Sequence, residues 1–417
     1  MQVVVAVPAA IDTAAASVAG LTREICGVGL LERTLLTAQR AGASEVVLVW
    51  PTGMPIEAAL NVLNSRRIQK KNNVRLLLVE SFDPDQPRTW VALQGELEDR
   101  FVWLPWNWVT NSRLLANLRD WGQSHTNWAM PGWVSKSTAA LGRIFQTQTK
   151  PLPEGIAVTS DETAAAAERF LVARSGKVSD GIHSSFNRRL CRPAVRWLSH
   201  TPITPNAVTF GGVVVSIFAA IAFARGSYWS YVLGALLFFV AGLFDEIDGM
   251  LARIKFADSP FGTYLESFGD SLSYVLLFGG ITVGLYRQHG VSQLWVGAAL
   301  LIGTVLALVV TTLQRKRAAS PDRPTEYLAN FYRKLEQDSG NWISRAVRQA
   351  QGFQRRGIMI HYIVIFTALG GVPAIFYLAT LGSHLTWTLA LYYNHRFFKQ
   401  PVQAAPLKQI HITQEAS

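Results

Sequence analysis

Six long apolar stretches in the C-terminal half limit the fold of this chain more than any other feature. They cover residues 206–224, 230–250, 262–286, 293–313, 357–373 and 374–395. Each is close to the roughly 20 apolar residues that an α-helix needs to cross a bilayer. The last two belong to one apolar run, which Gly370, Gly371 and Pro373 interrupt. An odd number of spans would place Arg396 and Lys399 on the side opposite to the other basic residues, so we expect six spans.

The first 175 residues have the pattern of a soluble α/β domain. Short β-rich apolar runs cover 2–8, 45–50, 74–79 and 101–104, and a helical pattern covers 30–40. Strands that alternate with helices predict a parallel sheet with helices on its faces. The predicted fold class is therefore an α/β cytosolic domain followed by an all-α transmembrane domain of six spans.

The change in pattern along the chain sets the expected domain boundaries. They are 1–175 for the α/β domain, 176–200 for a connector and amphipathic juxtamembrane segment, 201–397 for the transmembrane domain and 398–417 for a cytoplasmic tail. Apolar residues and arginines mix after Phe186, as in a helix at the membrane interface. A linker helix packed on the soluble domain is the alternative. Pro193 favours a kink or two shorter helices there.

The basic residues indicate the orientation in the membrane. The net charge is +11, and lysines and arginines gather at alternate ends of the predicted spans. Basic loops stay cytoplasmic, so we expect a multi-pass protein of the cell membrane with its N-terminal domain on the cytoplasmic side. The N-terminus lacks the charged region of a secretory signal, and Cys26 and Cys191 have no metal or redox spacing. The charge forms no stripe interleaved with aromatic residues, so nucleic-acid binding is not expected.

Acidic and small residues stand together at the end of the second predicted span. In a helix over 230–253, Asp245, Asp248, Gly249 and Ala252 fall at i, i+3, i+4 and i+7, on one face. Acids beside Leu, Phe and Val at this depth are costly unless a partner holds them. The small residues leave room for a ligand near the backbone. Arg253 adds a fork of donors that matches phosphate.

A second acidic face begins the third predicted span. In a helix over 262–285, Gly262, Glu266 and Asp270 fall at i, i+4 and i+8. Two antiparallel helices would bring four carboxylates to one point. Hard oxygen ligands in this number suit Mg²⁺, Mn²⁺ or Ca²⁺ and not zinc. Acids, cations and an arginine predict a site for a pyrophosphate-bearing substrate, at which two cations assist displacement at phosphorus.

The two acidic faces together resemble the signature of the CDP-alcohol phosphotransferases, D-x2-D-G-x2-A-R-x8-G-x3-D-x3-D. The chain matches every fixed position except the third aspartate, which is Glu266. Glutamate keeps the charge but displaces the carboxylate by about 1.5 Å, one C–C bond. Mg²⁺ tolerates such errors poorly, so this substitution bears on metal affinity and rate. A buried structural acid cluster and an inactive relative of the family are the alternatives.

The resemblance implies an activity and a role for each residue. Such enzymes move a substituted phosphate from a CDP-linked donor to an alcohol and release CMP. The metal ligands would be Asp245, Asp248, Glu266 and Asp270, which would bind two cations, Mg²⁺ or Mn²⁺. Asp270 would also be the catalytic base, Gly249 and Ala252 would line the nucleotide site, and Arg253 would hold the pyrophosphate. The expected partners are a CDP-linked lipid donor, a small alcohol or sugar-phosphate acceptor, membrane lipids and a second copy in a homodimer.

Two polar residues at the start of the first span are further candidates. Pro205 suits the first turn of a helix, and Asn206 and Thr209 lie three residues apart on one face. They could offer hydrogen bonds to a nucleotide at the cytoplasmic end, or simply cap the helix. Further along, His361 and His384 lie within spans, where a histidine is more often an interhelical hydrogen-bond partner than a ligand.

The N-terminal half resembles sugar-nucleotide and inositol-phosphate nucleotidyltransferases, around 29–35 and 40–49. Those enzymes bind phosphates with a G-x-G-T-R loop after the first strand. The corresponding residues 9–17 contain no glycine or arginine, and 104–108 contain no metal-binding aspartate. We therefore expect a domain that no longer transfers nucleotides. The junction at 177–209 resembles proteins that fuse an inositol-phosphate cytidylyltransferase to a CDP-alcohol phosphotransferase.

Three other functions compete with phospholipid synthesis. CDP-inositol as the donor would make the chain a di-inositol phosphate synthase, although the altered 9–17 loop implies that it would not make its own CDP-inositol. A catalytically inactive membrane scaffold would use the acids for a structural cation. A transporter would place the acids near mid-bilayer and contain an internal duplication, and the sequence contains no such repeat.

Overall fold

A computed structural model describes most of the chain. The described residues are 2–8, 18–80, 82–83, 89–90, 93, 95–98, 100–116, 133–135, 154–176, 182–318, 327–338, 340–350 and 356–398. They divide into two compact units. We call residues 1–208 and 246–262 the first unit, and residues 209–245 and 263–417 the second unit. The loop at 9–17, most of the connector at 177–181 and the predicted tail lie outside the described residues.

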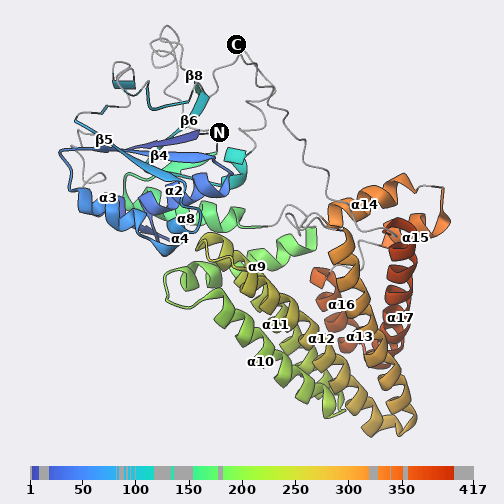
Figure 1. Cartoon of the computed structure of the whole chain (residues 1–417). Helices are drawn as coiled ribbons and strands as arrows, with labels where there is room; N and C mark the ends of the chain where they lie inside the picture. The colour runs from blue at the N-terminus through green and yellow to red at the C-terminus, as the bar shows by residue number, and fades with distance from the viewer. Residues whose placement is uncertain are drawn as a thin grey trace, which may run out of the picture. The chain divides into compact units, whose positions relative to one another are not determined.

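A five-stranded sheet forms the centre of the first unit (Figure 1). Its order is β5 (Val74–Val79), β4 (Glu45–Pro51), β1 (Gln2–Ala6), β6 (Arg100–Pro105) and β8 (Trp133–Ser135). The first four strands are parallel and β8 is antiparallel. The sequence predicted these four parallel strands, and the structure confirms them.

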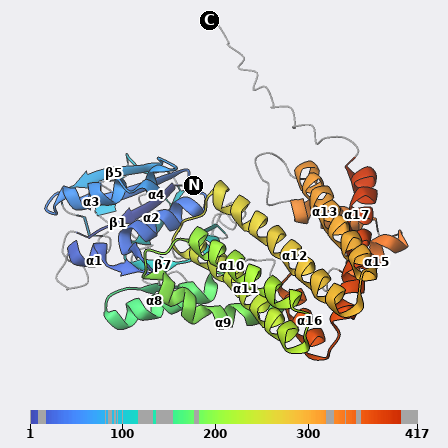
Figure 2. The same cartoon turned by 90° about the horizontal axis from the view of Figure 1, so that it is seen from below.

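Both faces of the sheet are buried, as a parallel sheet requires. In β1, Val3 and Val5 pack with helix α2 (Leu30–Arg40), while Val4 and Ala6 pack in a second cluster with Trp90 on the other face. Figure 2 shows α2 together with α3 (Ile56–Leu63) and α4 (Arg66–Gln69) along the sheet. Successive side chains of a strand point to opposite faces of the sheet, so one apolar strand contributes to the core on each face.

Two pairs of short strands and two helices complete the α/β part. Strands β2 (Glu24–Ile25) and β3 (Val28–Gly29) pair as a hairpin, and β7 (Trp108–Thr110) pairs with β9 (Gly155–Ala157). Helix α1 (Val18–Thr22) precedes the hairpin. Helix α8 (Asp161–Arg174) begins at a capping box in which Ser160 accepts from the Thr163 amide. The serine oxygen thereby satisfies a backbone amide that has no partner within the first turn of α8.

Helix α9 (Ile182–Ser199) follows the connector and contains Pro193 in its interior. Of the two predicted alternatives, the division into two shorter helices is therefore wrong, and the kink at Pro193 stays a prediction. Proline removes only one backbone donor, and the helix end has contacts that hold it. Glu168 of α8 accepts from Arg196 Nε at 3.3 Å and lies 3.0 Å from His200 Nε2, just beyond the helix. These contacts fix the end of α9 on the α/β part.

Within the described part of the chain, five helices are long and apolar enough to cross a membrane: α10 (Pro205–Ala224), α11 (Tyr228–Ile254), α12 (Pro260–His289), α13 (Ser292–Ala318) and α17 (Val372–Phe397). The fifth predicted span is the shorter helix α16 (Arg356–Ala368). A turn at Gly370, with φ of +77°, separates α16 from α17, so the predicted break is confirmed. The α/β region followed by apolar helices confirms the predicted fold class.

Small residues let helices of the second unit approach closely. A Cβ built on Gly280 of α12 would lie 2.5 Å from the Ala220 carbonyl oxygen of α10, and one on Gly284 would overlap the Phe223 carbonyl oxygen. Ser216 of α10 also donates to Ser273 of α12 at 2.9 Å. In lipid, the hydrophobic effect does not drive helices together. Helices there pack through small residues and short hydrogen-bonded bridges.

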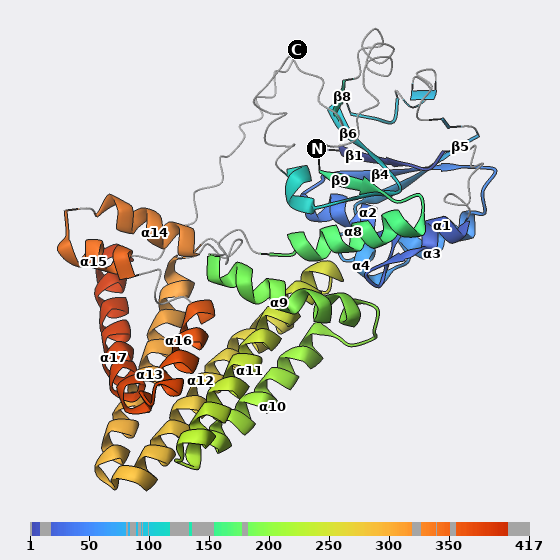
Figure 3. The same cartoon turned by 180° about the vertical axis from the view of Figure 1, so that it is seen from behind.

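Helices α13 and α17 form the other extensive helix pair (Figure 3). Trp387 Nε1 donates to His384 Nδ1 at 3.1 Å, which leaves His384 Nε2 as the protonated nitrogen that donates to the Ala299 carbonyl at 3.0 Å. His384 is thus the interhelical partner that was predicted. Its ring also fills the space beside Gly303.

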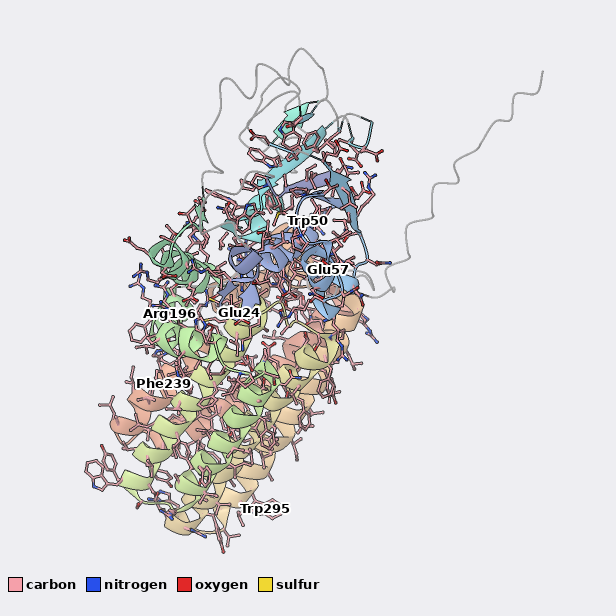
Figure 4. All side chains as sticks on the ribbon, turned by 90° about the vertical axis from the view of Figure 1, so that its left-hand side faces the viewer. Glu24, Trp50, Glu57, Arg196, Phe239 and Trp295 are labelled. Atoms are coloured by element: carbon pink, nitrogen blue, oxygen red, sulfur yellow. The ribbon has the colours of Figure 1, made fainter. Side chains whose placement is uncertain are left out.

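Large apolar side chains project outward from the second unit. Trp229 and Trp295 are each 77% exposed, near the starts of α11 and α13. Figure 4 shows the Trp295 side chain pointing away from the helices, whereas Trp50 lies among the strands of the sheet and is fully buried. Aromatic residues at span ends and exposed leucines between them are the surface expected in a bilayer.

A polar cluster joins the segment after α13 to the end of α17. Helices α14 (Tyr327–Gln337) and α15 (Trp342–Ala350) are both amphipathic. Asp338, between them, accepts from Arg396 at 2.7 and 3.1 Å and from Ser344 at 2.7 Å. Arginine and serine donors stabilise the carboxylate, and they lower the pKa of Asp338 below its ordinary value of 3.8.

Candidate functional site

The signature residues lie on the helices that the sequence predicted for them. Helix α11 carries Asp245, Asp248, Gly249, Ala252 and Arg253, and α12 carries Gly262, Glu266 and Asp270. The helix spacing therefore confirms that each acidic group shares one helix face. Asp245, Glu266 and Asp270 belong to the second unit, while Asp248 and the residues from Gly249 to Gly262 belong to the first.

The carboxylates differ in their exposure. Asp248 is only 3% exposed, whereas Asp245, Glu266 and Asp270 are half-buried. A buried carboxylate next to apolar side chains such as Ile247 is costly unless hydrogen bonds or a cation compensate it. Four acids with oxygen donors and no cysteine or histidine suit Mg²⁺ or Mn²⁺. The chemistry of the donor set therefore fits a hard divalent cation.

The convergence of these acids on one point stays a prediction. Among the residues that the structure describes, no group of three or more acidic, histidine or cysteine side chains lies close enough to hold a metal ion. Within each unit, however, the structure does bring other predicted site residues together.

Arg253 and Gly249 are packed against each other on α11. A Cβ built on Gly249 would lie 3.3 Å from Arg253 Nη1 and 3.5 Å from Nη2. Arg253 Nε donates to the carbonyl oxygen of Ser175, at the end of α8. The guanidinium therefore lies back along its own helix, over the glycine, with its Nε engaged. Any side chain at position 249 would displace it.

Asn206 and Gly262 meet at the starts of α10 and α12. A Cβ built on Gly262 would lie 3.2 Å from Asn206 Oδ1 and 3.1 Å from Ser259 Oγ. Ser259 Oγ accepts from the Gly262 amide at 3.0 Å and so caps α12. The two predicted site residues thus lie side by side in the first unit. The glycine keeps the Asn206 amide group next to the first turn of α12.

Thr209 lies beside the turn of α12 that carries Asp270. A Cβ built on Gly269, the residue before Asp270, would lie 3.5 Å from the Thr209 methyl and 3.3 Å from a Val213 methyl. Both contacts are within the second unit. Thr209 therefore packs through its methyl group, and the residue does more than cap its own helix.

The residues that hold Arg253 from the α/β part were not predicted from the sequence. Arg40, at the end of α2, donates from Nη1 to the Arg253 carbonyl at 2.9 Å, and Ser175 accepts from the Arg253 side chain. The available signal was the spacing of Arg33 and Arg40, which places two arginines on one face of a largely buried helix. The contacts of these two arginines with the end of α11 can be seen only in the tertiary structure.

Comparison with known proteins finds a family model that matches the central part of the chain. Residues 202–332 match the family model described as CDP-alcohol phosphatidyltransferase. This range includes all eight signature positions, with Glu266 at the third aspartate.

Individual relatives share moderate identity with the chain. The bifunctional IPC transferase and DIPP synthase of Aquifex aeolicus is 26% identical over 237 residues, which are 56% of this chain and 49% of the relative. Cholinephosphotransferase 1 of Gallus gallus is 29% identical over 136 residues, 29% of this chain and 40% of the relative. The archaetidylinositol phosphate synthase of Methanothermobacter thermautotrophicus is 32% identical over 100 residues, 24% and 50%. The chain thus spans half or less of the length of these relatives.

Proposed function

We propose that the chain, whose residues 202–332 match the CDP-alcohol phosphatidyltransferase family model, is an integral membrane phosphotransferase. It would move a substituted phosphate from a CDP-linked donor to an alcohol and release CMP, in phospholipid synthesis. The observation that carries the proposal is the signature on α11 and α12, with the Arg253 guanidinium lying over Gly249. A forked donor beside an acidic helix face suits a pyrophosphate.

Each residue would have a defined task in the reaction. The hydroxyl oxygen of the alcohol attacks the lipid-linked phosphorus, and the bond from that phosphorus to the CMP phosphate oxygen breaks. Asp270 would accept the hydroxyl proton, which keeps the attacking oxygen nucleophilic. Arg253 would hold the pyrophosphate oxygens, while Gly249 and Ala252 would leave room for the nucleotide. Asn206 and Thr209 would contact the nucleotide head.

The four carboxylates would bind the cations. Asp245, Asp248, Glu266 and Asp270 would share two Mg²⁺ or Mn²⁺ ions, which offset the negative charge that develops on the departing CMP. Glu266 is one methylene longer than the aspartate of the signature. Because Mg²⁺ demands near-ideal geometry, we expect Glu266→Asp to raise metal affinity.

The donor and acceptor follow from the similar proteins. A CDP-linked lipid and a small alcohol or sugar phosphate are the proposed substrates. Di-inositol phosphate synthesis from CDP-inositol is the second candidate, and the similarity to the Aquifex bifunctional protein favours it. That similarity covers 237 residues, so it extends beyond the 202–332 match.

The α/β domain at 1–175 would not transfer nucleotides itself. After β6, where related nucleotidyltransferases place a metal-binding aspartate, Trp106 and Trp108 are 4% and 5% exposed and belong to the core. A packed apolar position cannot bind a cation. The remaining proposed boundaries are a juxtamembrane segment at 176–200, a transmembrane domain at 201–397 and a tail at 398–417.

We place the protein in the cell membrane, with the α/β domain and the signature on the cytoplasmic side. The distribution of lysines and arginines at alternate span ends supports this orientation. A homodimer is the proposed assembly, by analogy with the family. Cysteine labelling at engineered positions in intact cells, and cross-linking in liposomes, would test orientation and assembly separately.

CMP release tests the proposed activity directly. Purified full-length protein in liposomes would receive CDP-diacylglycerol or CDP-inositol, each with inositol phosphate, inositol, glycerol phosphate or serine, and with Mg²⁺ or Mn²⁺. We expect release with one acceptor, and a loss of at least about 100-fold in Asp270→Asn because a general base is removed. Asp161→Asn, the same acid-to-amide change at a side chain that is 94% exposed and away from the signature, is the control.

The outcome separates the candidates. Release from CDP-diacylglycerol supports the phospholipid synthase, and release from CDP-inositol alone supports the di-inositol phosphate synthase. If neither donor released CMP, in the wild type or in Glu266→Asp, the proposal would be rejected. The scaffold function would then be the remaining candidate.

A further inference from the structure

Two arginines of α2 reach the loop that joins α11 to α12. We call residues 255–259 the signature loop, because they lie inside the eight-residue spacer of the signature. Arg33 is 2% exposed, and its Nη2 donates to the Ile254 carbonyl at 3.0 Å and to the Ile25 carbonyl at 2.6 Å. Arg40 donates to the Arg253 carbonyl and pairs with Asp258. The arginine pair therefore binds both sides of the loop.

Phe256 lies between the two arginines in a strained backbone conformation. Its φ is +52°, which is rare and unfavourable for a bulky residue. The guanidinium carbons of Arg33 and Arg40 lie 5.4 and 5.0 Å from the centre of its ring, and the ring packs against the α/β core. Cation–π contact and burial offset the strain. The loop adopts this conformation because Phe256 packs against the α/β core.

The same loop holds the entrance to α10. Lys255 is 8% exposed, and its Nζ donates to the Thr201 carbonyl at 2.6 Å and to the Ile203 carbonyl at 3.2 Å. From the β2–β3 turn, Gly27 has φ of +70° and lies so close to Ser199 that a Cβ would overlap its carbonyl oxygen. The segment that leads to Asn206 is thus tied to the signature loop and to the α/β part.

The cations of this cluster carry an electrostatic cost. Burial lowers the pKa of Arg33 to about 10, and burial together with Arg253 and Arg113 lowers the pKa of Arg40. Burial and Arg67 lower the pKa of Lys255. A pKa of about 10 still leaves Arg33 protonated at neutral pH. Arg33 and Lys255 are buried, whereas Arg40 is exposed. Like charges that repel one another weaken the fold, so stability alone does not explain why these residues are there.

We infer that Arg33 and Arg40 are positioning residues for the proposed transfer reaction: they fix the signature loop and the backbone of Arg253, so that the guanidinium meets the donor pyrophosphate. The α/β part would then serve the membrane reaction as a clamp on this loop, with Ser175 holding the Arg253 side chain from the other side. This inference rests on the proposed function, and it assigns a task to a domain that lacks nucleotidyltransferase residues.

Hydrogen exchange of the full-length protein tests the clamp without relying on activity. Arg40→Gln keeps a polar side chain but removes the guanidinium from Phe256 and Asp258. We expect exchange of peptides covering 253–259 to accelerate at least about 10-fold, as expected when local opening becomes easier. Arg75→Gln is the matched control, because Arg75 pairs with Glu45 and Glu96 on β5, away from the loop. It should leave the loop unchanged.

Steady-state kinetics give the functional readout. In Arg40→Gln we expect the KM for the CDP-linked donor to rise and kcat/KM to fall about 10–100-fold, because small displacements of a binding group are costly. The KM for the alcohol should stay within about twofold, since the alcohol does not contact Arg253. A purely structural role would lower the amount of active protein and leave both KM values unchanged.

A second, more conservative variant distinguishes a local effect on the loop from loss of the fold. Arg33→Lys keeps the charge but has one compact ammonium group in place of the planar fork, so it should give a milder form of both effects. Unchanged exchange at 253–259 in Arg40→Gln and Arg33→Lys would overturn the clamp. Unchanged KM for the donor, with faster loop exchange, would also overturn it. If the wild-type protein released no CMP, the proposed function would be rejected. The exchange experiment would still show whether Arg33 and Arg40 hold the signature loop.

Discussion

The α/β core and the membrane helices are packed by different means. The core of the first unit is built from large side chains, such as Trp50, Phe82 and Phe101, which are at most 1% exposed. The helices of the second unit meet at glycines, such as Gly280 and Gly284, whose missing side chains allow backbone contact. Large apolar residues there point outward instead, as Trp229 does.

This difference follows from the two solvents. Water drives apolar volume into a core, so the α/β part gains stability from what it buries. Lipid is as apolar as leucine, so membrane helices gain stability from close fit and from short polar bridges. Loss of volume should therefore harm the first unit, and gain of volume at contact glycines should harm the second.

The largest effect is expected from Trp50→Ala. Trp50 is fully buried in β4, and its removal leaves a cavity that should cost about 3–5 kcal/mol. Thermal unfolding of the α/β part in detergent would measure it. Trp229→Ala, in which the ring is 77% exposed, is the control and should change the unfolding temperature little. Equal destabilisation by the two variants would contradict the comparison.

A smaller but still large effect is expected from Gly284→Ala. The added methyl would overlap the Phe223 carbonyl, a backbone atom that cannot rotate away, and overpacking of this kind costs about 1–3 kcal/mol. Gly279→Ala, five residues earlier on α12 with no atom within 4 Å of its Cβ, is the matched control. Size-exclusion stability after heating would compare them. Tolerance of both changes would show that α10 and α12 do not depend on this contact.

Gly249→Ala should separate activity from stability. The methyl would lie 3.3 Å from Arg253 Nη1, so the guanidinium must shift by a few tenths of an ångström. Alanine also favours the helix by about 1 kcal/mol, so the unfolding temperature should not fall. We expect CMP release to drop about 10-fold, equivalent to about 1.4 kcal/mol. Full activity in this variant would mean that Arg253 does not act from its position over Gly249.

The smallest effect concerns Asp338 and pH. The pKa of Asp338 lies below its ordinary value of 3.8, mainly because Arg396 donates to it and secondarily because Ser344 does. The folded state is therefore favoured above pH 3.8, and this contribution is lost as the pH falls through the lower folded pKa. Asp338→Asn should be slightly less stable than wild type at pH 7 and equal to it near pH 2. A constant difference across this range would show that the carboxylate charge is not involved.

Local sequence patterns predicted most of the elements. The alternation of strands and helices gave β1, α2, β4, β5 and β6, and apolar length gave α10 to α13. The glycines at 370 and 371 predicted the break before α17. The prediction of two shorter helices around Pro193 is wrong. A proline weakens a helix locally, but Glu168 holds the end of α9 through contacts that the local sequence does not show.

The sequence by itself determined the chemistry that this protein can offer. The spacing of Asp245, Asp248, Glu266 and Asp270 on two helices, and the arginine among them, follows from helix periodicity, which is a local property. Only the tertiary structure decided what holds that chemistry in place. Arg40 and Arg253 are 213 residues apart, and no local pattern shows that one donates to the other. Contacts of this kind depend on how the whole chain folds, because they join surfaces that separate helices create.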